Sequence, residues 1–106
     1  MGVCGDLTVE RQLGHAADDE DERLVRAAVA GERGAFEALV SRHRRRMASV
    51  ATRFLDEPQD IEDAVQETFL RAYQQLGSLR SGAGVRAWLI SILVNVCRNK
   101  RRSFMR

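Results

Sequence analysis

Apolar residues recur through this chain at the spacing of one face of an α-helix. From Leu24 to Val96 the large apolar side chains repeat every three or four residues, and no segment keeps the two-residue alternation of a half-buried strand. Proline, which would interrupt such segments, occurs only once in the 106 residues. One all-α domain is therefore predicted, a compact bundle of about four helices, because a chain of this length suffices for a single core.

Glycine and proline divide this pattern into four segments. The predicted helices cover residues 18–30, 34–55, 60–76 and 85–102. Gly31 is expected to stop the first helix and Pro58 to separate the second from the third, since the residue before a proline disfavours helical geometry. Asp60 is predicted to cap the third helix in a capping box with Asp63. Three glycines within residues 77–84 predict a loop before the fourth helix.

The N-terminal residues differ from the rest of the chain. Residues 1–17 show no periodicity and few large apolar groups, which is typical of a flexible tail. The acidic run at 18–22 is expected to begin the folded domain, residues 18–106, because carboxylates favour the positive end of a helix dipole. Tyr73 and Trp88 lie on the apolar stripes of their helices, so both are predicted to pack in the core.

Few residues in this chain could carry metal-dependent or catalytic chemistry. Cys4 and Cys97 are predicted to be reduced thiols, since two isolated cysteines make neither a disulfide framework nor a zinc site. His15 and His43 lie far apart in the sequence and are predicted to be solvated. No nucleophile motif, phosphate-binding glycine loop or metal-ligand set is present, so we predict no enzyme, no metal and no cofactor. The sequence shows neither a membrane-spanning run nor a leader-type segment, which predicts a cytoplasmic protein without membrane insertion.

The charged residues are divided unevenly along the sequence. Residues 1–67 contain nine arginines and all 15 acidic residues, a net charge of −6, whereas residues 68–106 contain eight basic residues and no acidic one, a net charge of +8. A split of this kind predicts two partners of opposite charge, one of them a polyanion that binds the C-terminal part. A basic surface that only aids solubility is the alternative. The second predicted helix adds an arginine-rich face, which contains Arg42, Arg44, Arg45, Arg46 and Arg53.

Three successive segments carry recognisable motifs. They are the Phe36-Glu37-Ala38-Leu39 start of the second predicted helix, DIEDAVQETFLRAY at 60–73 and VRAWLISILVNVCRNKRR at 85–102. Together they resemble the second conserved region of the extracytoplasmic-function (ECF) group of sigma-70 family RNA polymerase sigma factors. The middle segment is the most specific, and the resemblance covers about residues 20–103. It implies a region 2 domain of a bacterial alternative sigma factor, which docks on core RNA polymerase and recognises and melts the promoter −10 element.

The resemblance implies a role for the polar face of the third predicted helix. In the family this helix docks on a coiled coil of the largest polymerase subunit. The polymerase-binding candidates are Asp60, Asp63, Gln66 and Glu67, of which the last three stand at positions that match the family. The last three share one helical face by their spacing, so their carboxylate and amide groups can meet arginines of a partner together. Without the resemblance, a plain solvated helix surface would be the preferred interpretation.

The resemblance also implies that the fourth predicted helix and the loop before it face DNA. The DNA-binding candidates are Arg80, Arg86, Asn95, Arg98, Asn99, Arg101 and Arg102. Arginines suit phosphates, and the Asn95 amide suits a base edge or a sugar. The loop expected to capture a −10 base contains Leu79, Ser81, Gly82, Ala83 and Gly84.

The sequence departs from the family pattern in three places. Ala83-Gly84 precedes the fourth helix where Ser-Ser is common, and Asn99 stands where an aspartate is usual. No counterpart of the family's second helical domain, region 4, follows residue 106, so we expect a fragment or a truncated form. An anti-sigma factor is a further expected partner.

Two other functions remain open at this point. A helix-turn-helix regulator would need a turn of about three or four residues, and the connection from Leu76 to Val85 is longer. A protein-interaction module could instead bind polymerase or an anti-sigma factor without reading DNA. Steep salt dependence of DNA binding would distinguish the DNA-binding functions from this module.

Overall fold

Helices account for nearly all of the part of the chain that the computed structural model describes, residues 19–79 and 84–105. The first helix covers residues 19–29 and is followed by α2 (Arg33–Ala51), α3 (Pro58–Gln74), the short 3-10 helix η1 (Leu76–Ser78) and α4 (Val85–Met105). No strand occurs within these ranges, so the predicted all-α class is confirmed. The predicted tail and most of the predicted base-capture loop lie outside the described residues.

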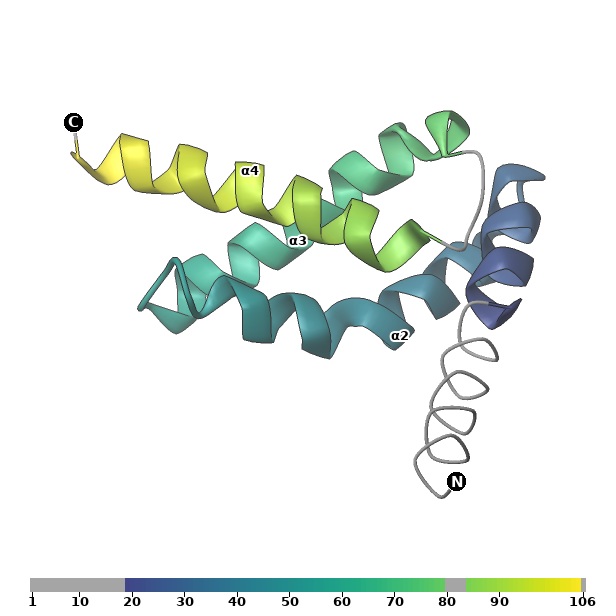
Figure 1. The fold of residues 1–106 in the computed structure, drawn as a ribbon, viewed down its shortest axis with the longest axis horizontal. Coiled ribbons are helices and arrows are strands. Elements are labelled where there is room, and N and C mark those ends of the chain that lie inside the picture. The colour runs from purple at the N-terminus through teal and green to yellow at the C-terminus, as the bar shows by residue number, and fades with distance from the viewer. Residues whose placement is uncertain (1–18, 80–83, 106) are drawn as a thin grey trace, which may run out of the picture.

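The three long helices pack on one another along their lengths. In Figure 1, α2 and α4 run along the body with α3 crossing between them, and the first helix packs across the end opposite to the end of α4. The core takes side chains from all four helices: Leu24, Val25, Leu39, Met47, Val65, Phe69, Leu89, Leu93 and Val96. Burial of each large apolar side chain contributes about 2 kcal/mol, so this shared core fixes the relative positions of the helices.

The ends of the first helix and of α2 show how local rules and packing combine. Gly31 adopts a φ of 100°, and the N–H groups of Gly31 and Glu32 bond to carbonyls of the last helical turn, which confirms the predicted stop. α2 ends at Ala51, earlier than predicted, and the chain continues in a tight turn. Phe54 and Leu55 still reach the core from this turn, which is why the apolar pattern extends past the helix.

The start of α3 corrects the predicted capping box. The helix begins at Pro58, two residues before Asp60, and Glu57 is the N-cap residue without a side-chain hydrogen bond. Proline fits the first position of a helix because its φ is already helical and its missing N–H is not needed there. Asp60 therefore lies in the first turn, where its charge suits the helix dipole, and Asp63 accepts a hydrogen bond from Gln59 at 3.1 Å.

Trp88, Tyr73 and Cys97 differ in how far they are buried in the structure. Trp88 is half-buried and packs against the core. Tyr73 is 58% exposed, so its predicted core position is wrong. Its ring instead packs edge-on against Phe36 at a centroid distance of 5.1 Å, which covers the rim of the core. Cys97 is a buried free thiol, and burial raises its pKa, so it stays protonated near neutral pH.

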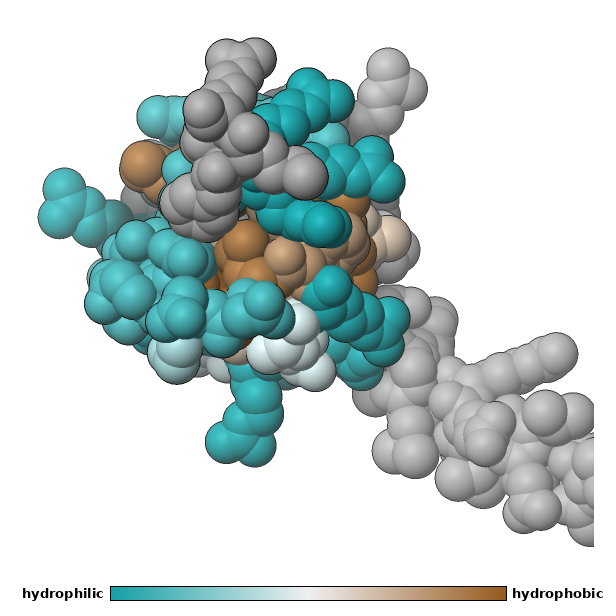
Figure 2. Space-filling view, turned by 90° about the vertical axis from the view of Figure 1, so that its left-hand side faces the viewer, coloured by the Kyte–Doolittle hydropathy of each residue, from teal (hydrophilic) through white to brown (hydrophobic). Residues whose placement is uncertain are grey.

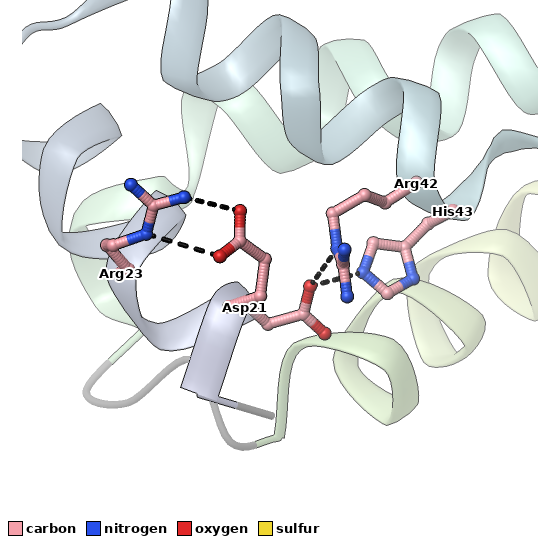
Figure 3. A network of polar contacts seen from close by, with 5 residues as sticks. Asp21, Arg23, Arg42 and His43 are labelled. Carbon is pink, nitrogen blue, oxygen red and sulfur yellow. Dashed lines mark hydrogen bonds and ion pairs between the residues drawn. The ribbon is translucent and has the colours of Figure 1, made fainter. Parts of the chain in front are cut away.

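A buried carboxylate joins the first helix to α2. Asp21 Oδ1 accepts a hydrogen bond from Arg42 Nε at 2.9 Å and lies 3.0 Å from His43 Nε2 (Figure 3). Asp21 and His43 are only 3% and 4% exposed, so the prediction of a solvated His43 is wrong. Asp21 was expected to favour its own helix start, but packing turns its carboxylate toward α2. A buried carboxylate requires such partners, because leaving it unpaired would cost several kcal/mol.

An exposed ion pair close to this network contributes much less to stability. Arg23, which is labelled in Figure 3, hydrogen-bonds to Glu20 at 2.6 Å in the same helix. The hydrogen bond from Arg23 holds the pKa of Glu20 below its usual value. Both side chains are solvent-exposed, so this pair adds little to stability. The Asp21 network, and not the surface pair, ties the two helices together.

Candidate nucleic-acid and protein interfaces

One exposed side of α3 gathers the predicted polymerase-binding residues. Gln66 is exposed, while Asp60, Asp63 and Glu67 are half-buried on the side turned away from the core residues Ala64, Val65, Thr68 and Phe69. The structure therefore brings the four predicted residues together on one helical face. Leu70, 59% exposed, lies four residues after Gln66 on this same side. We call Asp60, Asp63, Gln66, Glu67 and Leu70 the α3 face.

Leu70 is a member of the α3 face that sequence reasoning missed. Leucine so exposed is ordinary when it stands alone, but here it adjoins polar side chains in the pattern of an apolar contact with a polar rim. The sequence does contain a signal for Leu70. It stands seven residues after Asp63 and four after Gln66, which places it on the same helical face. The exposure of Leu70 was not predicted because its neighbour Phe69 is buried and already accounts for the apolar stripe at this point of the helix.

Two acidic members of the α3 face, Asp63 and Glu67, already have partners within the helix. Asp63 accepts the hydrogen bond from Gln59, and Glu67 forms an ion pair with Arg71 at 2.8 Å. The Glu67 and Arg71 side chains are 38% and 39% exposed, so the pair is worth only a few tenths of a kcal/mol. Both contacts are therefore weak and local to α3.

The second half of α4 carries a separate basic surface. Asn95, Arg98, Asn99 and Arg102 recur at three- and four-residue spacing, are all exposed, and form what we call the α4 cluster. Arg101 is also exposed and lies one turn beyond Arg98. No acidic residue occurs in α4. Figure 2 views the end of the bundle where α4 terminates and shows hydrophilic side chains surrounding an apolar area.

Arg86 lies apart from the α4 cluster. It belongs to the first turn of α4, nine residues before Asn95. This separation corresponds to about 14 Å along the helix axis and half a turn around it. The structure therefore does not bring Arg86 together with the other predicted DNA-binding residues of α4.

Arg86 instead meets the arginine-rich face of α2. A pocket of about 380 Å³ lies between the two helices, lined by Arg42, His43, Arg45, Arg46, Ser49 and Arg86. We call it the arginine pocket. The sequence showed the α2 arginines but gave no reason to join them to Arg86, because the contact depends on how the two helices pack.

The predicted base-capture loop is described only at its ends. Leu79 is half-buried and packs against the core, and Gly84 is exposed with open space around its Cα. Arg80, Ser81, Gly82 and Ala83 lie outside the described residues. Leu79 therefore anchors the N-terminal side of this segment to the bundle.

Comparison with known proteins agrees with the motifs. Residues 39–106 match the family model of sigma-70 region 2. The chain belongs to the sigma-70 region 2 family. The resemblance stated from the sequence is thereby confirmed, and membership of a family of sigma factors supports the prediction that the chain is not an enzyme.

Curated sigma factors match this region 2 chain along most of its length. It is 38% identical over 79 residues to the ECF RNA polymerase sigma-E factor of Haemophilus influenzae, covering 74% of this chain and 41% of that protein. It is 37% identical over 90 residues to the ECF RNA polymerase sigma factor SigM of Mycobacterium tuberculosis, covering 85% and 46%. The chain thus spans less than half the length of these curated relatives.

A solved structure matches the fold of the region 2 chain. It is an NMR structure of an engineered region 2 of sigmaE in complex with GTAAAA, with a TM-score of 0.73 and 34% sequence identity. The match covers 78% of this chain and 86% of that one.

Two searches of the described residues concern other kinds of site. No group of three potential metal ligands occurs among them. None of the described helices is both long and apolar enough to cross a membrane.

Proposed function

We propose that this chain is the region 2 module of an ECF sigma factor, which docks on core RNA polymerase and recognises and melts the promoter −10 element. The observation that carries the proposal is the likeness to a region 2 of sigmaE that was solved in complex with GTAAAA, at 34% identity and a TM-score of 0.73. The physical separation of an acidic α3 face from a basic α4 cluster supports it, because the two partners need opposite surfaces.

The α3 face is the proposed polymerase-binding surface. Its carboxylates would accept charge-assisted hydrogen bonds from arginines on the coiled coil of the largest subunit, with the Gln66 amide beside them. Leu70 supplies an apolar contact at the C-terminal end of this surface, which matters because polar pairs alone seldom yield tight binding.

The α4 cluster and residues 79–84 are the proposed −10 surface. Opening a duplex costs a few kcal/mol per unstacked step, and binding of the displaced strand must offset this cost. Arg98, Arg101 and Arg102 suit the phosphates of that strand, while Asn95 and Asn99 can hydrogen-bond to base edges or sugars. The glycine-containing segment that follows Leu79 is the proposed base-capture loop, since glycine permits close approach of the backbone to a base.

An anti-sigma factor is the third proposed partner. The relatives at 37% and 38% identity are ECF sigma factors, and the resemblance to this group is what suggests such a regulator. The α3 face is a candidate surface for it, because a protein that covers this face would block polymerase docking. The helix-turn-helix alternative is disfavoured, because ten residues separate Gln74, the end of α3, from Val85, the start of α4.

The test is binding of this chain to core RNA polymerase, measured for the wild type and for the double variant Asp63→Ala/Gln66→Ala. We expect a loss of at least about 100-fold in affinity with an unchanged circular-dichroism spectrum. The matched control is Glu37→Ala/Gln75→Ala, which removes the same two chemical groups from exposed positions outside the α3 face. Equal affinity of the two double variants would refute the assignment of the docking surface. A folded wild type that did not bind polymerase would refute the function.

A further inference from the structure

The arginine pocket concentrates positive charge from two helices. Arg42, Arg45, Arg46 and Ser49 stand at i, i+3, i+4 and i+7 of α2, so they share one side of that helix. Arg86 joins them from the first turn of α4. None of the described lining residues is acidic. The pocket therefore holds four guanidinium groups around one concave surface.

Part of this pocket is rigidly held. Asp21, on the first helix, accepts the hydrogen bond from Arg42 and contacts His43, both of which lie on α2 (Figure 3). His43 is 4% exposed, so its ring has a fixed place at the back of the pocket. The Asp21 carboxylate offsets one positive charge, and three further arginines remain. Preorganised donors lose less side-chain entropy when a ligand binds.

The other arginines have no partner within the described chain. Arg45, Arg46 and Arg86 form no ion pair with residues 19–79 or 84–102. Guanidinium groups that face one another repel, and an anion between them removes this repulsion. Phosphate oxygens are the favoured acceptors for such a group, because the planar guanidinium can donate two parallel hydrogen bonds to them. The positive end of the α4 dipole adds to this preference at Arg86.

We infer that the arginine pocket binds a backbone phosphate of single-stranded promoter DNA, as a contact separate from the α4 cluster. This inference rests on the proposed function. The DNA backbone is favoured over a free anion because Arg86 follows Gly84, the last residue of the proposed base-capture loop, by two positions. A strand that contacted Gly84 would therefore lie close to Arg86, which lines the pocket.

The distance between the two basic sites fits one strand that contacts both. Arg86 and Arg98 are separated by 12 residues of α4, about 18 Å along its axis. They lie on different sides of the helix, so a strand that reaches both must cross α4. Single-strand-binding surfaces typically contact about 4 to 16 nucleotides, which is enough chain for this path.

The test measures binding of a fluorescein-labelled, mixed-sequence single strand of about 12 nucleotides to the whole chain at several salt concentrations. In the double variant Arg45→Ala/Arg46→Ala we expect about tenfold weaker binding at low salt. The slope of log affinity against log salt should fall by about 0.7 for each phosphate contact that is lost. The matched control, Arg44→Ala/Arg53→Ala, removes two exposed arginines that do not line the pocket, one on α2 and one in the turn after it, and should leave the slope unchanged.

The possible outcomes separate this inference from the proposed function. A wild type that bound neither this strand nor polymerase would overturn the proposed function. Wild-type binding with equal salt slopes in the two double variants would overturn the pocket inference alone. Pyrophosphate is the probe for a free anion: pocket-dependent pyrophosphate binding, combined with an unchanged DNA salt slope, would also overturn the assignment to DNA. Circular dichroism of each variant confirms that the fold is retained.

Discussion

The α3 face and the α4 cluster are built by the same helical spacing but differ in chemistry. Each places four polar side chains on one exposed side of a long helix whose other side packs in the common core. The α3 face offers hydrogen-bond acceptors beside an exposed leucine, whereas the α4 cluster offers arginines and amides without any carboxylate. The difference teaches that one small core can display two surfaces of opposite charge.

Reversing the charge of the α3 face is the most severe challenge to this comparison. Asp63→Lys/Glu67→Lys replaces two acceptors with cations, so arginines of the partner would be repelled. We expect loss of polymerase binding by at least about 100-fold, with single-strand binding retained or strengthened. Parallel titrations with polymerase and with a single strand measure both effects. A parallel loss of DNA binding would show that the two surfaces are not independent.

Asp21 is an acidic residue of the N-terminal half that we expect to stabilise the fold and not to bind a partner. Asp21→Ala removes the hydrogen-bond acceptor of Arg42 and leaves the buried His43 without its carboxylate. We expect a loss of about 2–3 kcal/mol in the free energy of unfolding, measured by urea denaturation. Glu20→Ala, one position earlier in an exposed pair, is the control and should show no comparable loss. Equal stability of the two variants would contradict a structural role for Asp21.

Removing two arginines from the α4 side tests the other half of the comparison. Arg98→Ala/Arg101→Ala should weaken single-strand binding about tenfold at low salt, because each arginine is expected to contact a phosphate. The salt slope should fall by about 1.4, and polymerase binding should not change. Titrations with several sequences check the phosphate role. A selective loss for one sequence would argue instead that these arginines read bases.

The smallest expected effect is that of Leu70, which tests whether the α3 face also binds through apolar contact. Leu70→Ser keeps the exposed position of the side chain but removes its apolar surface. We expect about fivefold weaker polymerase binding, because roughly 1 kcal/mol of apolar contact is lost, and no change in DNA binding. Val29→Ser removes an apolar side chain of similar exposure from the first helix and serves as the control. The role of Leu70 fails if both variants bind polymerase with wild-type affinity.

Much of this fold follows from local rules that are written in the sequence. The apolar period gave the number of helices, glycine stopped the first helix at Gly31, and α4 begins at the predicted Val85. The same spacing placed Asp63, Gln66 and Glu67 on one face, because residues three and four apart are neighbours on any helix. These features depend only on residues close together in the chain. The binding roles assigned to them remain predictions.

The tertiary structure alone decided which residues of different helices meet. It buried Asp21 and His43 together across 22 positions of sequence, left Tyr73 at the rim of the core, and brought Arg86 to the α2 arginines. Periodicity states which side of a helix is apolar, but it contains neither the crossing angles nor the offsets of packed helices. Those are set by how large side chains such as Met47, Leu89 and Leu93 interlock in the shared core. The contacts across helices therefore follow from packing, while the helices and their faces follow from the sequence.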